Sequence, residues 1–289
     1  MNITINNRPA DITLDTERTL GDVLSGMEQW LAASGNRILG VSVNGADIGE
    51  SLSAVFDRDI GDIKKLDVSV SFWAELAAEA LAEIHTVCMQ YGDAGFAERA
   101  GISGVWDESA AARFLAADIP DMFSLAKLTF SGEGLSPQDF SLLIEERLRE
   151  IGDPVHEIRG SESLVLGIAA RMEELSLDVQ TGKDHRAAET IQQFSALGEK
   201  LFRLFSILKA RGLSPDTLVI DNRSARIFIE EFNAALKELS AAYENRDTVL
   251  VGDLTEYELA PRLLQFFSAL KDFSASSPFS ISAMTADSI

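Results

Sequence analysis

The sequence has very few of the residues that most often bind metals or act as nucleophiles. Its 289 residues include one cysteine and three histidines. Cys88 has no partner for an internal disulfide, whereas a secreted chain of this size often carries several bridges. His85 and Cys88 lie three residues apart, but no second His/Cys pair exists to complete a tetrahedral zinc site. We therefore expect a cytoplasmic protein without a metal or other cofactor, in which a partly buried His lies beside a core Cys.

Basic residues are also scarce. Lys and Arg number 25 against 46 Asp and Glu, which gives a formal net charge of −21. Such a surface repels phosphate, so nucleic acids and anionic membranes are poor partners and basic protein surfaces are suitable ones. No run approaches the roughly 18 uncharged apolar residues that span a bilayer. The segment Met1–Arg8 lacks the basic and apolar regions of a secretory signal. We expect a protein partner, no nucleic acid and no membrane.

The common catalytic and phosphate-binding motifs are missing. The sequence has no Gly-x-x-x-x-Gly-Lys-Ser/Thr loop, no Gly-x-Gly-x-x-Gly after a strand and no Gly-x-Ser-x-Gly elbow. The segment 57–62 resembles the start of a calcium loop. However, Asp62 stands where glycine is needed, and Val68 stands where a bidentate Glu is needed. These absences predict that the protein has no catalytic residues and is not an enzyme.

Residues 1–71 carry the patterns of a small domain of strands around one helix. Asn6-Asn7, two residues that tolerate positive φ, separate two alternating apolar segments and predict a hairpin. Thr19 with Asp22 resembles a helix capping box, and Gly35 stands where a glycine often follows the last turn. The expected elements are a hairpin with Ile3 and Ile5 in one strand and Ile12 and Leu14 in the other, a helix from Leu20 to Leu31, a strand with Leu39, Val41 and Val43 before Asn44-Gly45, and a last strand with Leu66, Val68 and Val70.

This order of strand, strand, helix, strand, strand resembles the β-grasp, or ubiquitin-like, superfold over residues 1–71. Ubiquitin-like carriers end in an exposed Gly-Gly tail, whereas here the last strand runs through Ser69-Val70-Ser71 into Phe72. Ferredoxin-type members hold an iron–sulfur cluster with four cysteines, and this segment contains none. The resemblance therefore implies a module that serves as a docking surface or as a structural cap.

From Phe72 onward the apolar residues follow helical spacing. The stripes are wide, which is typical of helices that pack against one another rather than of a coiled-coil seam. The expected fold is therefore α+β: a small N-terminal β-grasp-like domain, residues 1–71, followed by a mainly α-helical bundle domain, residues 72–272. The stripes fall in the segments 73–91, 140–151, 164–175, 191–208, 227–239 and 254–270. We expect the second helix to begin at Ser136 and Pro137 and to end at Gly152. In the last segment, Pro261 predicts either a kink or the start of the helix.

Two further features concern the organisation of the helical region. Gly134-Leu-Ser-Pro137 and Gly212-Leu-Ser-Pro215 are each followed by an acidic helix pattern. They indicate either a duplicated helical unit or only the frequent use of Ser-Pro at helix starts. Residues 273–289 are rich in Ser and Ala without helical spacing, and we expect them to be a disordered tail.

The segment 245–262 mixes acids, aliphatic residues and one tyrosine more densely than the rest of the chain. One interpretation is a protein-binding face made by Asp253, Glu256 and Tyr257, because Tyr supplies a large contact area with a polar tip. The other is a pair of core helices whose acids cap turns or pair with Arg246 and Arg262. Both remain open at the level of sequence.

The leading hypothesis is a non-enzymatic, acidic, cytoplasmic interaction protein: an adaptor, an assembly factor or a chaperone-like protein. One alternative is an enzyme whose site is built from scattered Asp, Glu, Tyr and Arg, which a concave pocket with perturbed carboxylates would favour. The other is a structural subunit of a larger assembly, which an extended exposed apolar patch would favour.

Overall fold

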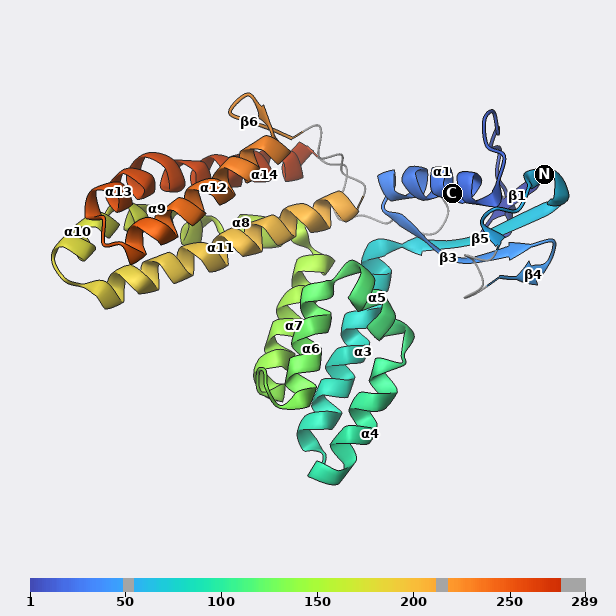
Figure 1. The fold of residues 1–289 in the computed structure, drawn as a ribbon, viewed down its shortest axis with the longest axis horizontal. Coiled ribbons are helices and arrows are strands. Elements are labelled where there is room, and N and C mark those ends of the chain that lie inside the picture. Colours follow the sequence, from blue (N-terminus) through green and yellow to red (C-terminus); the bar gives the residue numbers. More distant parts are fainter. Residues whose placement is uncertain (49–54, 212–217, 277–289) are drawn as a thin grey trace. The chain divides into compact units, whose positions relative to one another are not determined.

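The computed structural model describes residues 1–48, 55–211 and 218–276. Its fold is α+β, as predicted. A five-stranded mixed sheet and one helix occupy residues 1–72, and the chain after them is mainly helical (Figure 1). The contacts divide the chain into two compact units. The first holds Met1–Gly152 and a short stretch that begins at Lys209, and the second begins at Asp153.

The sheet of the first unit has the strand order β2-β1-β5-β3-β4. Its two central strands, β1 and β5, are parallel, and every other pairing is antiparallel. Hairpin turns at Asn6-Asn7 and Asn44-Gly45 have positive φ at both residues, as the turn residues predict. The strands are β1 (Asn2–Ile5), β2 (Arg8–Pro9), β3 (Asn36–Val43), β4 (Ala46–Asp47) and β5 (Lys65–Phe72).

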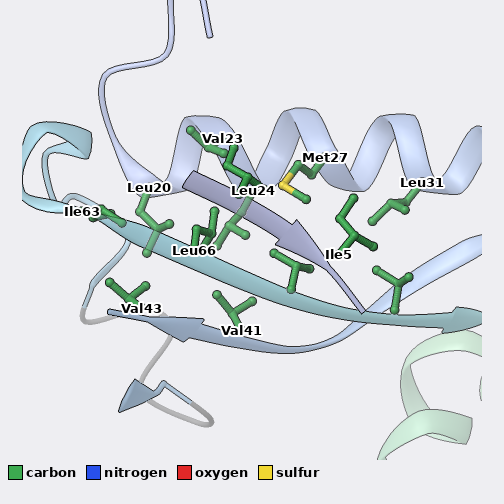
Figure 2. Close-up of a cluster of buried hydrophobic side chains, with 13 residues drawn as sticks. Ile5, Leu20, Val23, Leu24, Met27, Leu31, Val41, Val43, Ile63 and Leu66 are labelled. Atoms are coloured by element: carbon green, nitrogen blue, oxygen red, sulfur yellow. The ribbon is translucent and has the colours of Figure 1, made fainter. Parts of the chain in front are cut away.

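Helix α1 (Leu20–Ala33) covers one face of this sheet and encloses the core of the module. Its N-terminus has the predicted capping box between Thr19 and Asp22, and Gly35 follows its C-cap with φ of 76°. Figure 2 shows side chains of α1 and of the strands meeting between helix and sheet. The buried members include Leu20, Val23, Leu24, Met27 and Leu31 from the helix and Ile5, Val41, Val43, Leu66 and Val68 from the sheet.

Two details of this module differ from the sequence patterns. The second strand of the hairpin ends at Pro9, with one further backbone hydrogen bond from Ala10 N to Ile3 O at 2.9 Å, so the expectation of a strand through Ile12 and Leu14 is wrong. Both side chains nevertheless pack on the core. Leu39 points outward and is 56% exposed, because a bulge between Ile38 and Gly40 shifts the alternation.

Five helices follow the sheet in the first unit. Helix α3 contacts α4, α5 and α7, and α6 contacts α5 and α7 (Figure 1). The predicted stripes did not include residues 92–135, where α4, α5 and α6 lie. Each of these helices is short and buries between one and four residues, so its apolar side gives little contrast. The helices are α3 (Trp73–Asp93), α4 (Phe96–Asp107), α5 (Ala110–Asp118), α6 (Pro120–Ser131) and α7 (Pro137–Gly152).

The first unit contains both the sheet and these helices, and the last strand ends at Phe72, next to the predicted boundary at residue 71. Strand β5 runs directly into α3 at Trp73. The Trp73 indole Nε1 donates to Asp118 Oδ1 at 3.1 Å, and Arg37 Nε lies 3.4 Å from the same oxygen. One carboxylate at the end of α5 thus links a strand and a helix.

The second unit is a bundle centred on stacked phenylalanines. Phe232 on α12 stacks on Phe194 of α11, with ring centroids 5.8 Å apart, and Phe228 stacks on Phe266 of α14 at 6.1 Å. Its elements are α8 (Pro154–Gly160), α9 (Glu162–Glu173), α10 (Leu175–Gln180), α11 (Asp184–Ala210), β6 (Val219–Ile220), β7 (Arg223–Ser224), α12 (Ala225–Glu244), α13 (Thr248–Asp253), a π-helical turn (Leu254–Leu259) and α14 (Ala260–Ser276).

Several predicted boundaries change in this unit. The stripe over 164–175 is divided between α9 and α10 at Glu174, and the hairpin β6-β7 has no counterpart in the predicted elements. Helix α14 continues through Ser276, so residues 273–276 are helical rather than part of a tail. The rest of the predicted tail and the second Gly-Leu-Ser-Pro segment, 212–215, lie outside the described residues.

Candidate functional site

The three residues predicted to bind a partner lie on one exposed side of α13 and the turn after it. Asp253 and Glu256 are exposed, and Tyr257 is 68% exposed. Val249, one helical turn before Asp253, is 70% exposed. The spacing 249, 253, 256, 257 is that of neighbours along one helix face. We call these four residues the Tyr257 surface.

The backbone under this surface is a π-helical turn, Leu254–Leu259, between two α-helices. Its inner side is fixed by buried groups. Thr255 is fully buried, and its Oγ1 donates to Val251 O at 2.8 Å. Leu254 and Leu259 are also buried. Because π turns are rare and occur frequently at functional sites, this turn is a second feature that distinguishes the surface.

The two acids act electrostatically on the tyrosine. The adjacent Glu256 carboxylate raises the pKa of the Tyr257 hydroxyl, and the negative charge of Asp253 raises it further. The hydroxyl therefore remains neutral at physiological pH. Within the described parts of the chain, neither Asp253 nor Glu256 forms an ion pair with a Lys or Arg.

The structure divides the two sequence interpretations of segment 245–262 between different acids. Asp247 caps α13 by accepting from Leu250 N at 3.1 Å, and Glu258 pairs with Arg262 at 3.0 Å. These two acids have the structural roles that the core-helix interpretation assigned to them. Asp253 and Glu256 do not share those roles.

The close approach of α10 supports α13 from the side. A Cβ on Gly252 would lie 3.0 Å from Ser176 Cβ, so the absence of a side chain at this position allows the contact. The surface therefore stands on a helix that is packed against α10 and continuous with α14.

A second polar cluster, which no sequence pattern indicated, lies between α3 and α7. His85 Nε2 lies 2.7 Å from Ser141 Oγ and 3.6 Å from Glu145 Oε1. Both partners contact the same ring nitrogen, whereas in a catalytic triad the carboxylate binds the other nitrogen. Ser141 lies inside a helix, where its own N–H is used by the helix and provides no oxyanion hole. The cluster is best described as a polar contact between the two helices.

The remaining sequence candidates take structural or exposed positions. His156 and His185 are exposed. Asp59 accepts from Gly61 N at 2.7 Å and caps the short helix Ile60–Asp62. In residues 1–48, 55–211 and 218–276, no three His, Cys, Asp or Glu side chains gather as a metal site would require. No helix in these same ranges has the length and apolar character needed to cross a bilayer.

We expect Cys88 to be unreactive in the folded protein. The residue is fully buried, and burial raises the pKa of its thiol to about 11. At pH 8 only about one thiol in a thousand would be ionised, and the thiolate is the reactive form. A disulfide reagent such as 5,5′-dithiobis(2-nitrobenzoate) should therefore leave the native protein unmodified and label one thiol after unfolding in guanidinium. Rapid labelling of the native protein would contradict this expectation.

Comparison with known proteins finds relatives for both parts of the chain. Residues 1–71 match the family model described as the TP0873 N-terminal domain, and residues 157–268 match a domain of unknown function, DUF8042. An uncharacterized protein of Treponema pallidum (strain Nichols) is 30% identical over 110 residues, which are 38% of this chain and 54% of that protein. This chain thus spans about half the length of that curated relative. No solved structure matches.

The two family models match different features of the chain. The sheet module coincides with the first match, and the Tyr257 surface lies inside the second. The descriptions of these similar proteins name no activity, substrate or partner. The geometry of the surface must therefore support any functional proposal.

Proposed function

We propose that the protein is a non-enzymatic interaction protein, an adaptor or assembly factor of the cytoplasm, that binds a basic protein partner through the Tyr257 surface. The observation that carries the proposal is the combination of two exposed apolar side chains, Val249 and Tyr257, with two acids that form no ion pair in the described chain. Folding leaves these groups in contact with solvent, where a partner can reach them.

The chemistry of the surface supports a protein rather than another class of partner. Tyrosine is enriched at protein interfaces because it buries a large area and keeps a polar tip. The net charge of −21 attracts basic surfaces and repels phosphate. Charge complementarity of this kind mainly increases the association rate and excludes wrong partners.

For the N-terminal module we propose a docking or capping role, as the resemblance to the β-grasp superfold implies. The strand order with parallel β1 and β5 at its centre and α1 across one face supports that resemblance.

Charge reversal tests this proposal. We expect Asp253→Lys with Glu256→Lys to reduce partner binding by about tenfold or more, because like charges would then face the basic partner. The measurement is affinity capture of the tagged full-length protein from its native cells at low salt, with quantitative mass spectrometry. Both side chains are exposed, so the melting temperature of the double variant should change little.

A matched control carries the same change of charge elsewhere in the second unit. Glu189→Lys with Glu238→Lys reverses two exposed acids on α11 and α12. We expect this control to retain the proteins that the Asp253/Glu256 variant loses. If both variants lose the same proteins equally, binding depends on net charge alone and the proposed surface is wrong. If neither variant loses any, the surface is not the interface.

A further inference from the structure

We propose that the Tyr257 surface recognises an arginine side chain of the partner, with the guanidinium stacked on the Tyr257 ring and paired with the carboxylates of Asp253 and Glu256. This inference rests on the proposed function and specifies the chemistry of the partner. It concerns one partner residue, and it distinguishes arginine from lysine.

The Tyr257 ring is accessible for stacking. The side chain is 68% exposed, so much of it is open to solvent. It lies on a π-helical turn whose backbone is ordered between α13 and α14. A backbone that is ordered before binding lowers the entropy that the complex must lose. Beneath the ring, the buried side chain of Thr255 holds the π turn in place.

Charge complementarity at short range favours a cation at this surface. Asp253 lies about one helical turn before Tyr257 and Glu256 directly precedes it, and all three residues are exposed, so both acids lie near the ring. Neither has a cationic partner in the parts of the chain that the structure describes. By contrast, Glu258 on the same turn is already paired with Arg262. A cation that stacks on Tyr257 would therefore meet two carboxylates that are free to pair with it.

The chemistry of the surface favours arginine over lysine. A guanidinium is planar and weakly hydrated, and it can stack on an aromatic face while its N–H groups donate two hydrogen bonds to a carboxylate. An ammonium is a strongly hydrated point charge that does not offer both contacts in one plane. The protein itself contains such a stack, since the guanidinium carbon of Arg99 lies 5.0 Å from the centroid of the Tyr91 ring.

A second copy of the chain is a poorer occupant of the surface. Each copy carries a net charge of −21, so two copies repel one another at moderate salt. The surface itself presents two acids and no base, so it cannot pair with itself in a two-fold interface. A partner with an exposed arginine meets neither obstacle.

The tyrosine content of the protein makes the inference testable by NMR. The sequence has three tyrosines: Tyr91 is buried, Tyr243 is half-buried and Tyr257 is exposed. Full-length protein with ¹³C-labelled tyrosine rings therefore gives a small set of signals. The probes are two blocked peptides that differ only in one central residue, Gly-Ser-Arg-Ser-Gly and Gly-Ser-Lys-Ser-Gly, and the corresponding hexa-arginine and hexalysine peptides.

We expect the arginine peptides to shift the Tyr257 signals saturably, with an affinity about fivefold or more above that of the lysine peptides. The reason is that only a guanidinium can stack on the ring and form bidentate hydrogen bonds with a carboxylate at the same time. Tyr91 and Tyr243 should not respond. Tyr257→Leu, followed by the backbone signals of α13 in ¹⁵N-labelled protein, should abolish the preference for arginine. Tyr257→Phe keeps the stacking face, so it should retain the preference.

The carboxylates are tested with neutral isosteres. Asp253→Asn with Glu256→Gln keeps the shape of the surface and should weaken arginine binding by about tenfold, because charge-assisted hydrogen bonds are lost. Glu189→Gln with Glu238→Gln is the matched control and should have little effect. Equal weakening by both variants would mean that the peptides respond only to net charge, and this would overturn the inference.

The outcomes separate this inference from the proposed function. If arginine and lysine peptides bind equally, or if Tyr257→Leu keeps the preference for arginine, arginine recognition is wrong. Partner capture that still depends on Asp253 and Glu256 would then leave the proposed function standing. If capture does not depend on these acids, the proposed function fails whatever the peptides show.

Discussion

Replacing Phe232 with alanine is expected to lower the free energy of unfolding of the second unit by about 3–5 kcal/mol. The side chain is 2% exposed and lies at the centre of the phenylalanine cluster. It stacks on Phe194, its ring meets that of Phe202 edge-on at 5.5 Å, and it lies 6.4 Å from Phe228. Truncation would remove three ring contacts at once and leave a cavity that rigid neighbouring helices cannot fill.

The measurement is urea unfolding followed by far-ultraviolet circular dichroism and by tryptophan fluorescence. All three tryptophans, Trp30, Trp73 and Trp106, belong to the first unit, so their fluorescence reports on that unit. We expect the dichroism transition to shift more than the fluorescence transition. Ile227→Ala on the same helix is the control, because Ile227 is 42% exposed and its truncation should cost only about 0.5 kcal/mol. A loss for Phe232→Ala as small as that of the control would contradict the prediction.

Replacing Glu150 with alanine should destabilise the first unit by about 3–5 kcal/mol, for an electrostatic reason. Glu150 is fully buried, and its Oε2 lies 3.2 Å from Nη1 of Arg147, which is itself 7% exposed. The other terminal nitrogen of Arg147 lies 3.5 Å from Asp121 on α6. Without Glu150, the guanidinium would remain buried with only this longer, more exposed contact, and an uncompensated buried charge is costly.

Tryptophan fluorescence is the direct readout for this variant, since the affected unit holds all the tryptophans. The double variant Glu150→Leu with Arg147→Met tests the cause. Replacement of both charges by apolar groups of similar size should recover part of the lost stability, because the Arg147 guanidinium is then no longer buried without its Glu150 partner. A double variant as unstable as Glu150→Ala would show that packing at position 150, rather than charge, determines the loss.

The sequence by itself predicted the parts of the fold that depend on local chemistry. The capping box of Thr19 and Asp22, the turns at Asn6-Asn7 and Asn44-Gly45, and the start of α7 at Pro137 all occur as expected. Each depends on residues within a few positions of one another. Long, strongly periodic helices such as α3 and α12 were predicted for the same reason, because one apolar stripe determines their buried side.

Features that depend on distant contacts were not available from the sequence. The outward position of Leu39 follows from a bulge in the pairing of β3 with β5, and the short α4, α5 and α6 are stabilised by packing on neighbouring helices. The link from Trp73 to Asp118 joins residues 45 positions apart. No local propensity encodes such contacts.

The candidate site likewise combines features that the sequence predicted with features that only the tertiary structure decided. The dense mixture of acids, aliphatic residues and one tyrosine in segment 245–262 identified Asp253, Glu256 and Tyr257 as candidates. Only the tertiary structure separated them from Asp247 and Glu258, which cap and pair within the fold. The role of an acid depends on whether the folded chain brings a cation or an N–H group within hydrogen-bond distance of its carboxylate. The sequence alone does not specify that distance.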